Sequence, residues 1–540
     1  MKNVITRRDF LKAAGISAVS LALHGCADAA TKPENTNQTD SDRPNILILM
    51  TDQQRYDSLG CYGAKMIDTP NLDRLAKEGA LFERCYSPCP VCTPSRASML
   101  TGKAVPGHGV YKLHDILPDD QVLMSKRLQD IGYETSLIGK LHVSGLWHEA
   151  QTRHPNDGFD HYHWCIDPGL NFDSEFNAFA RYVEKKDPVF YEKLKKEGKN
   201  LQHFPVECHF THWACETTID LIKNRDEKKP FFALMSLFDP HDPYFDHPLE
   251  SREMVRDDLI PEPIPAGDDK DRPSDIKREM EKGHLIKTQS ETFKAPIKEL
   301  RKGYYASIAF LDLEIGKILD YLDAENLTEN TFVIFVSDHG DMLWDRGLFS
   351  KGGFFFEPSI RVPFLMRYPK KIKAGTRVKE PVQLFDIAAT CLTLAGFDKA
   401  KLGEAMPESM DLISFIKEGK AYENYRDHAV CCYRNTGYGP GQKYFDPPIH
   451  CTMFRDQRYK LNVYHDVDND HNDLEGELYD MADDPQENNN LWSEPEYSKV
   501  KMKLMDRLMD WMVDNSVRYP GSRGGEKFKT LKKNYYGDSK

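Results

Sequence analysis

The sequence predicts an α/β fold built on a parallel sheet that helices cover on both faces. Short apolar runs of strand length alternate with amphipathic helical patterns along the body of the chain, and this alternation is typical of βαβ units. Four of the apolar runs are followed at once by charged or imidazole side chains. Because ligands bind at the carboxyl ends of strands in open α/β sheets, these four ends are predicted to form one site.

The four strands are short apolar runs with polar residues directly behind them. They are predicted at residues 45–50, 134–139, 231–237 and 331–337. Runs of this length, rich in aliphatic and aromatic residues, suit strands buried on both faces. In strand order, the residues that follow are Asp52 and Gln53, Lys140 and His142, Asp239 and His241, and Asp338 and His339.

Three helices have clear sequence signals. Thr69-Pro70 begins one that ends before Gly79, with Leu72 on its apolar face. A longer amphipathic helix is predicted at residues 300–322, and a terminal one at residues 499–512 with Leu504, Leu508 and Met512 on one face. These helices are predicted to be scaffold.

The first and last of the four strands offer metal ligands. Asp52, Gln53, Asp338 and His339 provide oxygen and imidazole donors from two strand ends, which is a donor set that suits a divalent cation. Taken singly, Asp52 and Asp338 are also consistent with capping of the turns or helices that follow.

Residues 1–26 indicate an export signal. Residues 6–12 (TRRDFLK) form a twin-arginine pattern, and the apolar run that follows is too short to span a membrane. Residues 23–26 are similar to a lipoprotein cleavage box, which predicts lipidation of Cys26, whereas cleavage between residues 27 and 30 is the alternative. Residues 27–42 are predicted to be a flexible tether. The protein is therefore expected in the bacterial periplasm or cell envelope, with a membrane tether through Cys26.

The composition excludes several classes of protein. The chain has 540 residues and a net charge of -13, with a mean hydropathy of -0.61. No apolar run approaches the roughly 20 residues of a membrane-spanning helix. No long Lys/Arg run indicates nucleic-acid binding, and the 12 cysteines form no paired CxxC metal motif.

One motif carries a family resemblance. CTPSR at residues 92–96, followed by TG at residues 101–102, resembles the signature of the type I, formylglycine-dependent sulfatases of the alkaline-phosphatase-like superfamily. Segments such as GKLH, DPHDPY and SDHGD occur in the order of that family. The resemblance implies a large mixed, mostly parallel sheet sandwiched by helices in residues 43–420. It also implies a smaller C-terminal α+β subdomain on a short antiparallel sheet in residues 421–540.

The resemblance also implies a role for each motif residue. A formylglycine-generating enzyme would oxidise Cys92, and the hydrated aldehyde would attack sulfur, with Arg96 holding the hydrate. A thiol or alcohol at that position would leave a sulfated enzyme that hydrolyses slowly, whereas a diol releases sulfate by returning to the aldehyde. The remaining implied roles are sulfate binding by Lys140 and Lys351, proton removal by His142, leaving-group protonation or binding by His241, and metal binding by Asp52, Gln53, Asp338 and His339.

Two positions depart from the commonest pattern of the family. Gln53 and His339 stand where many members have an aspartate and an asparagine. The resemblance implies Ca²⁺ as the metal. Because calcium prefers oxygen ligands, the imidazole of His339 leaves Mn²⁺ or another softer ion open. The same pair is found in the branch that contains phosphonate monoester hydrolases and in many bacterial carbohydrate sulfatases.

Three further side chains are candidates for substrate binding. Residues 145–230 are rich in aromatics and histidines, and an excursion of this kind on the strand-end side would shape a pocket, with His209 or His212 reaching the leaving group. Ordinary packing of a helical cap is the alternative. Residues 246–299 are predicted to be a surface excursion that carries subsites. Arg434, in the C-terminal part, is predicted at the pocket edge.

The sequence therefore predicts a sulfuric ester hydrolase acting on a sulfated carbohydrate. A phosphonate or phosphate ester hydrolase on the same scaffold is the first alternative, because the diol, the metal and the lysines would serve a phosphoryl centre equally. A carbohydrate-binding lipoprotein whose Cys92 is never oxidised is the second.

Overall fold

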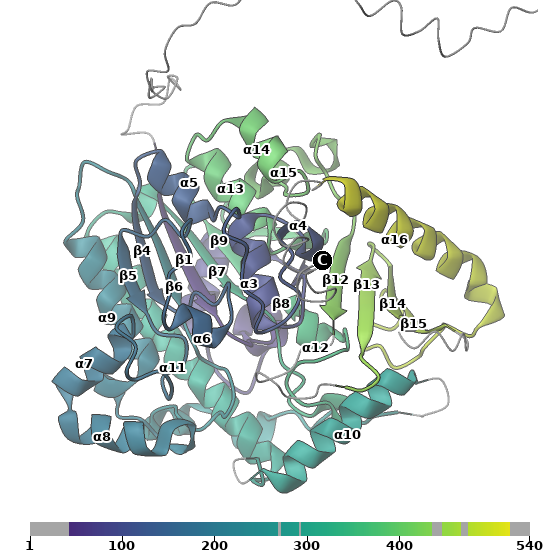
Figure 1. The fold of residues 1–540 in the computed structure, drawn as a ribbon, viewed down its shortest axis with the longest axis horizontal. Helices are drawn as coiled ribbons and strands as arrows, with labels where there is room; N and C mark the ends of the chain where they lie inside the picture. The colour runs from purple at the N-terminus through teal and green to yellow at the C-terminus, as the bar shows by residue number, and fades with distance from the viewer. Residues whose placement is uncertain (1–42, 268–271, 291–292, 435–444, 466–473, 519–540) are drawn as a thin grey trace, which may run out of the picture. The chain divides into compact units, whose positions relative to one another are not determined.

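The computed structural model describes residues 43–267, 272–290, 293–434, 445–465 and 474–518 (Figure 1). The predicted export signal, Cys26 and the tether to residue 42 lie outside the described residues. Within them, no helix is both long enough and apolar enough to cross a membrane.

The largest sheet among the described residues has eight strands in the order β10-β2-β9-β7-β1-β6-β4-β5. Its pairs are parallel except those that β9 makes with β7 and β2. The expected mixed, mostly parallel sheet is therefore confirmed. The strands are β1 (Asn45–Thr51), β2 (Ala80–Phe82), β4 (Glu134–Gly139), β5 (His161–Trp164), β6 (Phe231–Ser236), β7 (Thr331–Ser337), β9 (Phe364–Arg367) and β10 (Thr376–Val378).

Helices cover both faces of this sheet (Figure 1). Leu47 and Leu49 of β1 belong to one core cluster, whereas Ile46 and Ile48 belong to the other, because successive strand side chains point to opposite faces. The first cluster includes residues of α2 (Pro70–Glu78), α7 (Ala178–Lys186), α8 (Pro188–Glu197), α9 (Phe210–Lys223) and α11 (Ile297–Ala324). The second includes residues of α3 (Cys92–Thr101), α5 (Met124–Asp130), α13 (Asp386–Leu394), α14 (Lys399–Ala405) and α15 (Leu412–Glu418).

A separate antiparallel sheet of four strands follows in the C-terminal part. It consists of β12 (Ala429–Arg434), β13 (His450–Arg455), β14 (Tyr459–Tyr464) and β15 (Glu475–Asp480), and α16 (Ser498–Arg518) lies along it (Figure 1). The described residues group into one unit, so the boundary at residue 420 remains a prediction.

The packed face of α16 corrects one expectation. Leu504 and Leu508 are buried against the C-terminal sheet, but Met512 is 41% exposed. Each step of four residues turns a helix about 40° past a full turn, so Met512 has rotated about 80° away from Leu504. Trp511 takes its place in the packing.

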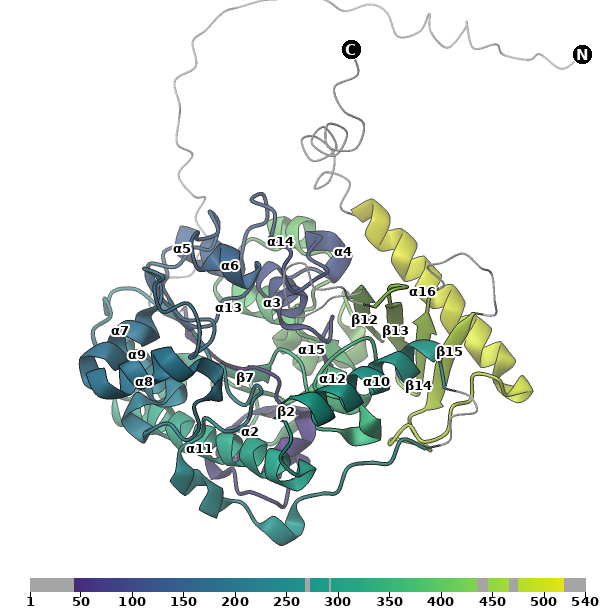
Figure 2. The same cartoon turned by 60° about the horizontal axis from the view of Figure 1, so that its bottom comes forward.

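Helix α10 (Ser274–Gln289) runs beside the C-terminal sheet (Figure 2) and reaches a cavity of the main body. At its start, the Ser274 backbone N–H donates to Glu475 of β15 at 2.8 Å, and Ile276 is buried in the C-terminal core. At its other end, Ile286 lines a cavity of the main body. The predicted surface excursion at residues 246–299 therefore carries a helix that reaches the cavity. Further elements are α4 (Val105–His108), α6 (Leu146–Glu149), α12 (Glu357–Ile360) and a three-stranded sheet of β3 (Cys85–Tyr86), β8 (Arg361–Val362) and β11 (Val382–Gln383).

The four strands with polar residues behind them are neighbours. β7, β1, β6 and β4 are adjacent and mutually parallel. Their carboxyl ends therefore meet at one edge of the sheet, as predicted.

Candidate active site

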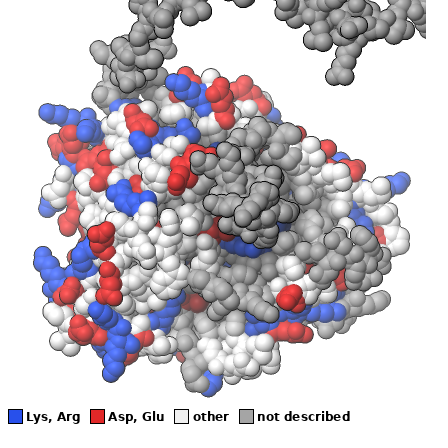
Figure 3. Space-filling view, viewed as in Figure 1, with Lys and Arg blue, Asp and Glu red and all other residues white. Residues whose placement is uncertain are grey.

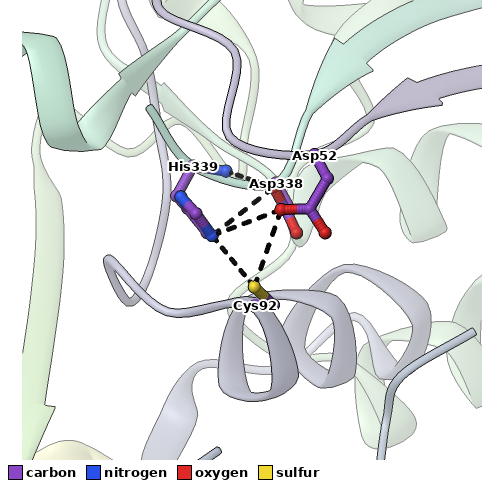
Figure 4. A group of neighbouring side chains, drawn as sticks. All are labelled: Asp52, Cys92, Asp338 and His339. Carbon is purple, nitrogen blue, oxygen red and sulfur yellow. Dashed lines mark hydrogen bonds and ion pairs between the residues drawn. The ribbon is translucent and has the colours of Figure 1, made fainter. Parts of the chain in front are cut away.

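Four buried side chains meet at this edge (Figure 4). Asp52 follows β1, Asp338 and His339 follow β7, and Cys92 is the first residue of α3. One ligand atom from each lies within 4.8 Å of all the others. The Cys92 Sγ is 3.1 Å from His339 Nε2 and 3.6 Å from Asp52 Oδ1.

These donors fit a divalent cation. His339 Nδ1 is 2.9 Å from the Gly340 carbonyl, and because a carbonyl only accepts, Nδ1 must carry the proton. The lone pair is then on Nε2, which is 3.7 Å from Asp52 and 3.8 Å from Asp338. Two carboxylates and an imidazole oriented in this way are able to hold a metal ion, and these three residues are called the metal-binding group below.

Arg96 and Lys140 balance the two carboxylates. Arg96 Nε donates to Asp338 at 2.7 Å, its Nη2 donates to Asp52 at 3.1 Å, and Lys140 Nζ donates to Asp52 at 2.6 Å. Arg96 also donates to Ser236 Oγ and the Lys140 carbonyl. Burial opposes ionisation of Asp52, as does Cys92, yet Lys140 and other cations hold the pKa of its carboxyl below its usual value.

Cys92 lies in a cationic environment at a helix N-terminus. It is 1% exposed, and burial alone would raise its pKa. Lys140, Lys351 and His339 outweigh burial and hold the pKa of the thiol well below its usual value. The start of α3 adds the positive end of the helix dipole. Cys92 is therefore easier to ionise than its neighbours Cys85 and Cys89, because burial raises the pKa of both of those thiols.

Gln53 connects the metal-binding group with Lys351. Its Nε2 donates to Asp341 at 2.6 Å and to Asp242 at 3.2 Å, and Lys351 Nζ donates to its Oε1. Gln53 has a φ of 67°, a left-handed conformation that non-glycine residues rarely adopt and that is common at functional sites. The Gln53 backbone N–H donates to Asp338 at 3.0 Å, so Gln53 lies beside the cluster, and its role as a metal ligand stays a prediction.

Lys351 and His241 form the opposite wall. Lys351 Nζ lies 2.8 Å from His241 Nε2, and His241 Nδ1 is 2.8 Å from the Asp242 carbonyl and so carries the proton. Burial would raise the pKa of Asp242, but His241, Lys351 and Lys199 together lower it. His241 Nε2 is left as an acceptor that faces the lysine.

His142 sits on a loop that Glu149 of α6 holds. The backbone N–H groups of residues 142, 143 and 144 donate to the Glu149 carboxylate at 2.8, 2.7 and 2.9 Å. His142 Nε2 is 3.0 Å from Thr93 Oγ1, and burial followed by Lys140 lowers its pKa to about 3. His142 is therefore neutral at neutral pH and able to accept a proton.

Gly139 explains how β4 delivers this loop. It has a φ of 98°, and a Cβ there would lie 2.1 Å from the Ser236 carbonyl oxygen. That carbonyl accepts a hydrogen bond from the Lys140 N–H at 2.9 Å. Glycine is required because the chain turns while touching the neighbouring strand.

Cys92, Lys140, His142, His241 and Lys351 line one cavity of about 430 Å³. The two predicted excursions supply much of its wall, including Ile166, Asp167, Lys199 and Phe293. The lining residues are Cys92, Leu113, His114, Lys140, His142, Leu146, Ile166, Asp167, Leu170, Lys199, Phe238, His241, Asp242, Ile286, Ser290, Phe293, Phe349 and Lys351. Acidic and basic side chains intermingle on the face drawn in Figure 3. Three lysines and two aspartates line the cavity.

Three predicted substrate contacts do not line this cavity. His209 is 1% exposed, caps α9 through Thr211 N–H and packs against Phe310. His212 pairs with Glu314 of α11 at 3.1 Å. Arg434 donates to the carbonyls of its own sheet at 2.8 and 2.7 Å. Each of the three is used by the scaffold here and none is among the residues that line this cavity, so their contact with substrate stays a prediction.

Several cavity and support residues were missed in the sequence. Asp242 and Asp341 stand inside the DPHDPY and SDHGD segments, so their position in a motif was the available signal. Asp167 and Lys199 come from irregular segments and Glu149 ends the four-residue helix α6, and neither periodicity nor spacing marks any of them.

Comparison with known proteins supports these assignments of the fold. The family model described as "Sulfatase" matches residues 44–397, and the model described as "N-sulphoglucosamine sulphohydrolase, C-terminal" matches residues 345–514. An N-acetylglucosamine-6-O-sulfatase of Bacteroides thetaiotaomicron is 29% identical over 91% of this chain and 88% of its own. An ulvan-active sulfatase of Formosa agariphila is 30% identical over 91% of this chain and 84% of its own.

Solved structures share the architecture. A structure of a protein in complex with its substrate D-glucosamine-2-N,6-O-disulfate matches with a TM-score of 0.68 and 25% identity, covering 89% of this chain and all of that one. A phosphonate monoester hydrolase of Agrobacterium radiobacter matches with a TM-score of 0.69 and 20% identity, covering 88% and 96%. The second likeness concerns the fold alone.

Proposed function

The chain belongs to the sulfatase family, and we propose that it hydrolyses sulfate esters on a sulfated carbohydrate through a formylglycine made from Cys92. The observation that carries the proposal is the position of Cys92. It lies at the start of α3, between a buried metal-binding group and a cavity with three lysines. A sulfate group in this cavity would meet a nucleophile position and several cations at once.

The proposed nucleophile is produced by a partner enzyme. A formylglycine-generating enzyme would oxidise Cys92 before export, since the twin-arginine route carries folded proteins. The hydrated aldehyde supplies one hydroxyl that attacks sulfur and a second that allows sulfate to leave. Thr93 and Arg96, next to Cys92 on α3, would hold its surroundings in place.

The proposed cofactor is one divalent metal, held by Asp52, Gln53, Asp338 and His339. When bound, it would lower the pKa of the attacking hydroxyl and polarise the sulfate oxygens. Three oxygen donors favour Ca²⁺. The imidazole of His339 also suits Mn²⁺ or another softer ion.

The remaining residues would manage charge and protons. Lys140 and Lys351 line the cavity and would bind sulfate oxygens. His142, neutral because its pKa is about 3, would accept a proton as sulfate leaves. His241 would protonate or bind the leaving oxygen. Lys351 Nζ lies 2.8 Å from His241 Nε2 and would supply the proton to it.

A carbohydrate leaving group is supported by the relatives and by the cavity. The relatives named above act on N-acetylglucosamine and ulvan sulfates. The cavity combines apolar walls such as Phe238, Phe293 and Phe349 with polar groups, a mixture typical of ligand pockets. The predicted export signal and lipidated Cys26 support action in the periplasm or cell envelope, where such polymers are met.

The test is a kinetic comparison on the matured holoenzyme. N-acetylglucosamine 6-sulfate, N-acetylgalactosamine 6-sulfate and 4-nitrophenyl sulfate are compared with 4-nitrophenyl phosphate and a phenylphosphonate monoester. The proposal expects a higher kcat/KM for sulfates, lost in Cys92→Ala. Faster turnover of phosphorus esters would favour the alternative hydrolase, and carbohydrate binding without any turnover would favour the unmodified binding lipoprotein.

A further inference from the structure

One ion pair on the cavity wall lies outside the roles assigned above. Lys199 Nζ is 2.6 Å from Asp167 Oδ2, and both residues line the cavity. The Asp167 side chain is 7% exposed and that of Lys199 is 43% exposed. Neither residue contacts Cys92 or the metal-binding group, so the pair is available for another task.

The pair is fixed by its backbone. Asp167 Oδ1 accepts from the Gly169 N–H at 2.9 Å. A Cβ on Gly169 would lie 2.8 Å from the Lys199 backbone nitrogen, so the loop that carries Asp167 packs directly on the turn that carries Lys199. Such contact holds a polar pair in position before any ligand arrives.

The pair lies close to the sulfate-binding end of the cavity. Phe238 is the common reference, because Lys199 Nζ and Lys140 Nζ are each 5.8 Å from its ring centroid. The His241 ring centroid is 4.8 Å from the same point. The Lys199 ammonium is therefore at most about 11 Å from the His241 ring, a distance that hydrogen bonds to one sugar ring can bridge.

The chemistry of the pair points to hydroxyl groups. Lys199 has three donors, of which Asp167 takes one among the described residues, and Asp167 has acceptor sites left on both oxygens. The pair as a whole is neutral, and its carboxylate would repel a second sulfate or a uronate placed beside it. Adjacent hydroxyls satisfy both members, since one accepts from Lys199 while its neighbour donates to Asp167.

We propose that Asp167 and Lys199 determine specificity by binding two neighbouring hydroxyl groups on the sugar whose sulfate is removed. The favoured substrate class is therefore a sugar sulfate with a free diol across the ring from the ester, and without a second anionic group at that place. This proposal rests on the proposed function, because the sugar is oriented by a sulfate that lies beside Cys92. Lys199 donates to one hydroxyl and Asp167 accepts from the other.

Kinetics on two kinds of ester tests the pair. Lys199→Met and Asp167→Asn are compared with Lys196→Met, an exposed lysine of α8. With N-acetylglucosamine 6-sulfate or its N-acetylgalactosamine counterpart, kcat/KM should fall at least about tenfold more than with 4-nitrophenyl sulfate, which has no hydroxyls. Lys196→Met should change neither. Equal losses on sugar and aryl esters would overturn the proposal, because they would indicate a merely structural pair.

A binding measurement separates this proposal from the proposed function. In the Cys92→Ala background, calorimetry with the same two sugar sulfates should show affinity weakened at least about tenfold by Lys199→Met, and 3-deoxy or 4-deoxy analogues should lose that dependence. If the parent binds neither sugar, or the variant binds both unchanged, the proposal is wrong. If binding depends on Lys199 while the mature enzyme cleaves no sulfate ester, the proposed function fails and the pair stands.

Discussion

The strand-end cluster and the cavity wall are built in different ways. Asp52, Lys140 and Asp338 follow directly on neighbouring strands, so the register of the sheet sets their spacing. Asp167 and Lys199 come from excursions whose loop contacts position them. The sheet therefore positions the residues at the reacting sulfate, whereas local loop packing positions the residues proposed to contact the leaving group.

The two regions also differ in charge balance. In the cluster, Arg96 and Lys140 are buried with Asp52 and Asp338, and each charge has a direct partner. On the wall, Lys199 keeps donors that face the cavity. Substitutions should therefore affect stability in the first region and substrate choice in the second.

The largest expected effect is on the nucleophile position. Cys92→Ala should lower kcat/KM for every sulfate ester by at least about a thousandfold, because no residue nearby replaces the nucleophile. Cys89→Ala, three residues away and also buried, is the matched control and should retain activity within a few fold. Steady-state kinetics with thermal unfolding of both variants checks this, and comparable losses in the two would refute the assignment.

The second effect concerns buried charge. Arg96→Met leaves Asp52 and Asp338 without their guanidinium, so the free energy of unfolding of the metal-free protein should fall by about 3–5 kcal/mol. Arg256→Met removes an exposed pair with Asp68, which water screens, so its cost should be much smaller. Urea titrations of both variants measure the difference. A similar cost for both would mean that the cluster is not held by charge.

The same rule should hold where α12 meets the C-terminal sheet, through acid stability, because Glu357 pairs with Lys460 of β14 at 3.0 Å. Burial would raise the pKa of Glu357, but Lys460 and nearby arginines lower it to about 2 from 4.5. A lowered pKa contributes stability above pH 4.5, and this contribution is lost as the pH falls from 4.5 toward 2. Lys460→Met should reduce this loss by up to about 2 kcal/mol. Unfolding measured at pH 3 and pH 6 tests it, and an unchanged pH dependence would contradict the pairing.

The smallest expected effect concerns Glu149, which lies in the same excursion as the cavity wall but supports a residue of the reacting site. Glu149 belongs to the excursion but holds the loop of His142. Glu149→Gln should lower kcat about tenfold on sugar and aryl sulfates alike, since it misplaces a proton acceptor and not a sugar contact. Glu216→Gln, on the exposed side of α9, is the control. A loss confined to sugar esters would assign Glu149 to substrate choice.

The sequence predicted the cluster better than the wall. β4 and β7 match the predicted ranges, and β1 and β6 differ by one residue, because continuous apolar runs with polar ends leave little choice. The cap that His209 makes on α9 and the pair of His212 with Glu314 could not be predicted from the sequence, because both depend on tertiary contacts. Lys199 had no signal at all, since its partner Asp167 is 32 residues away on another loop.

The most direct test of the account is mass spectrometry of the tryptic peptide of residues 85–96, from protein made with and without a co-expressed formylglycine-generating enzyme. We expect an aldehyde at Cys92 only with the partner, thiols at Cys85 and Cys89 in both samples, and sulfatase activity in proportion to the aldehyde. Full activity with an unmodified thiol at Cys92, or a persistent thiol despite proven oxidising machinery, would contradict it.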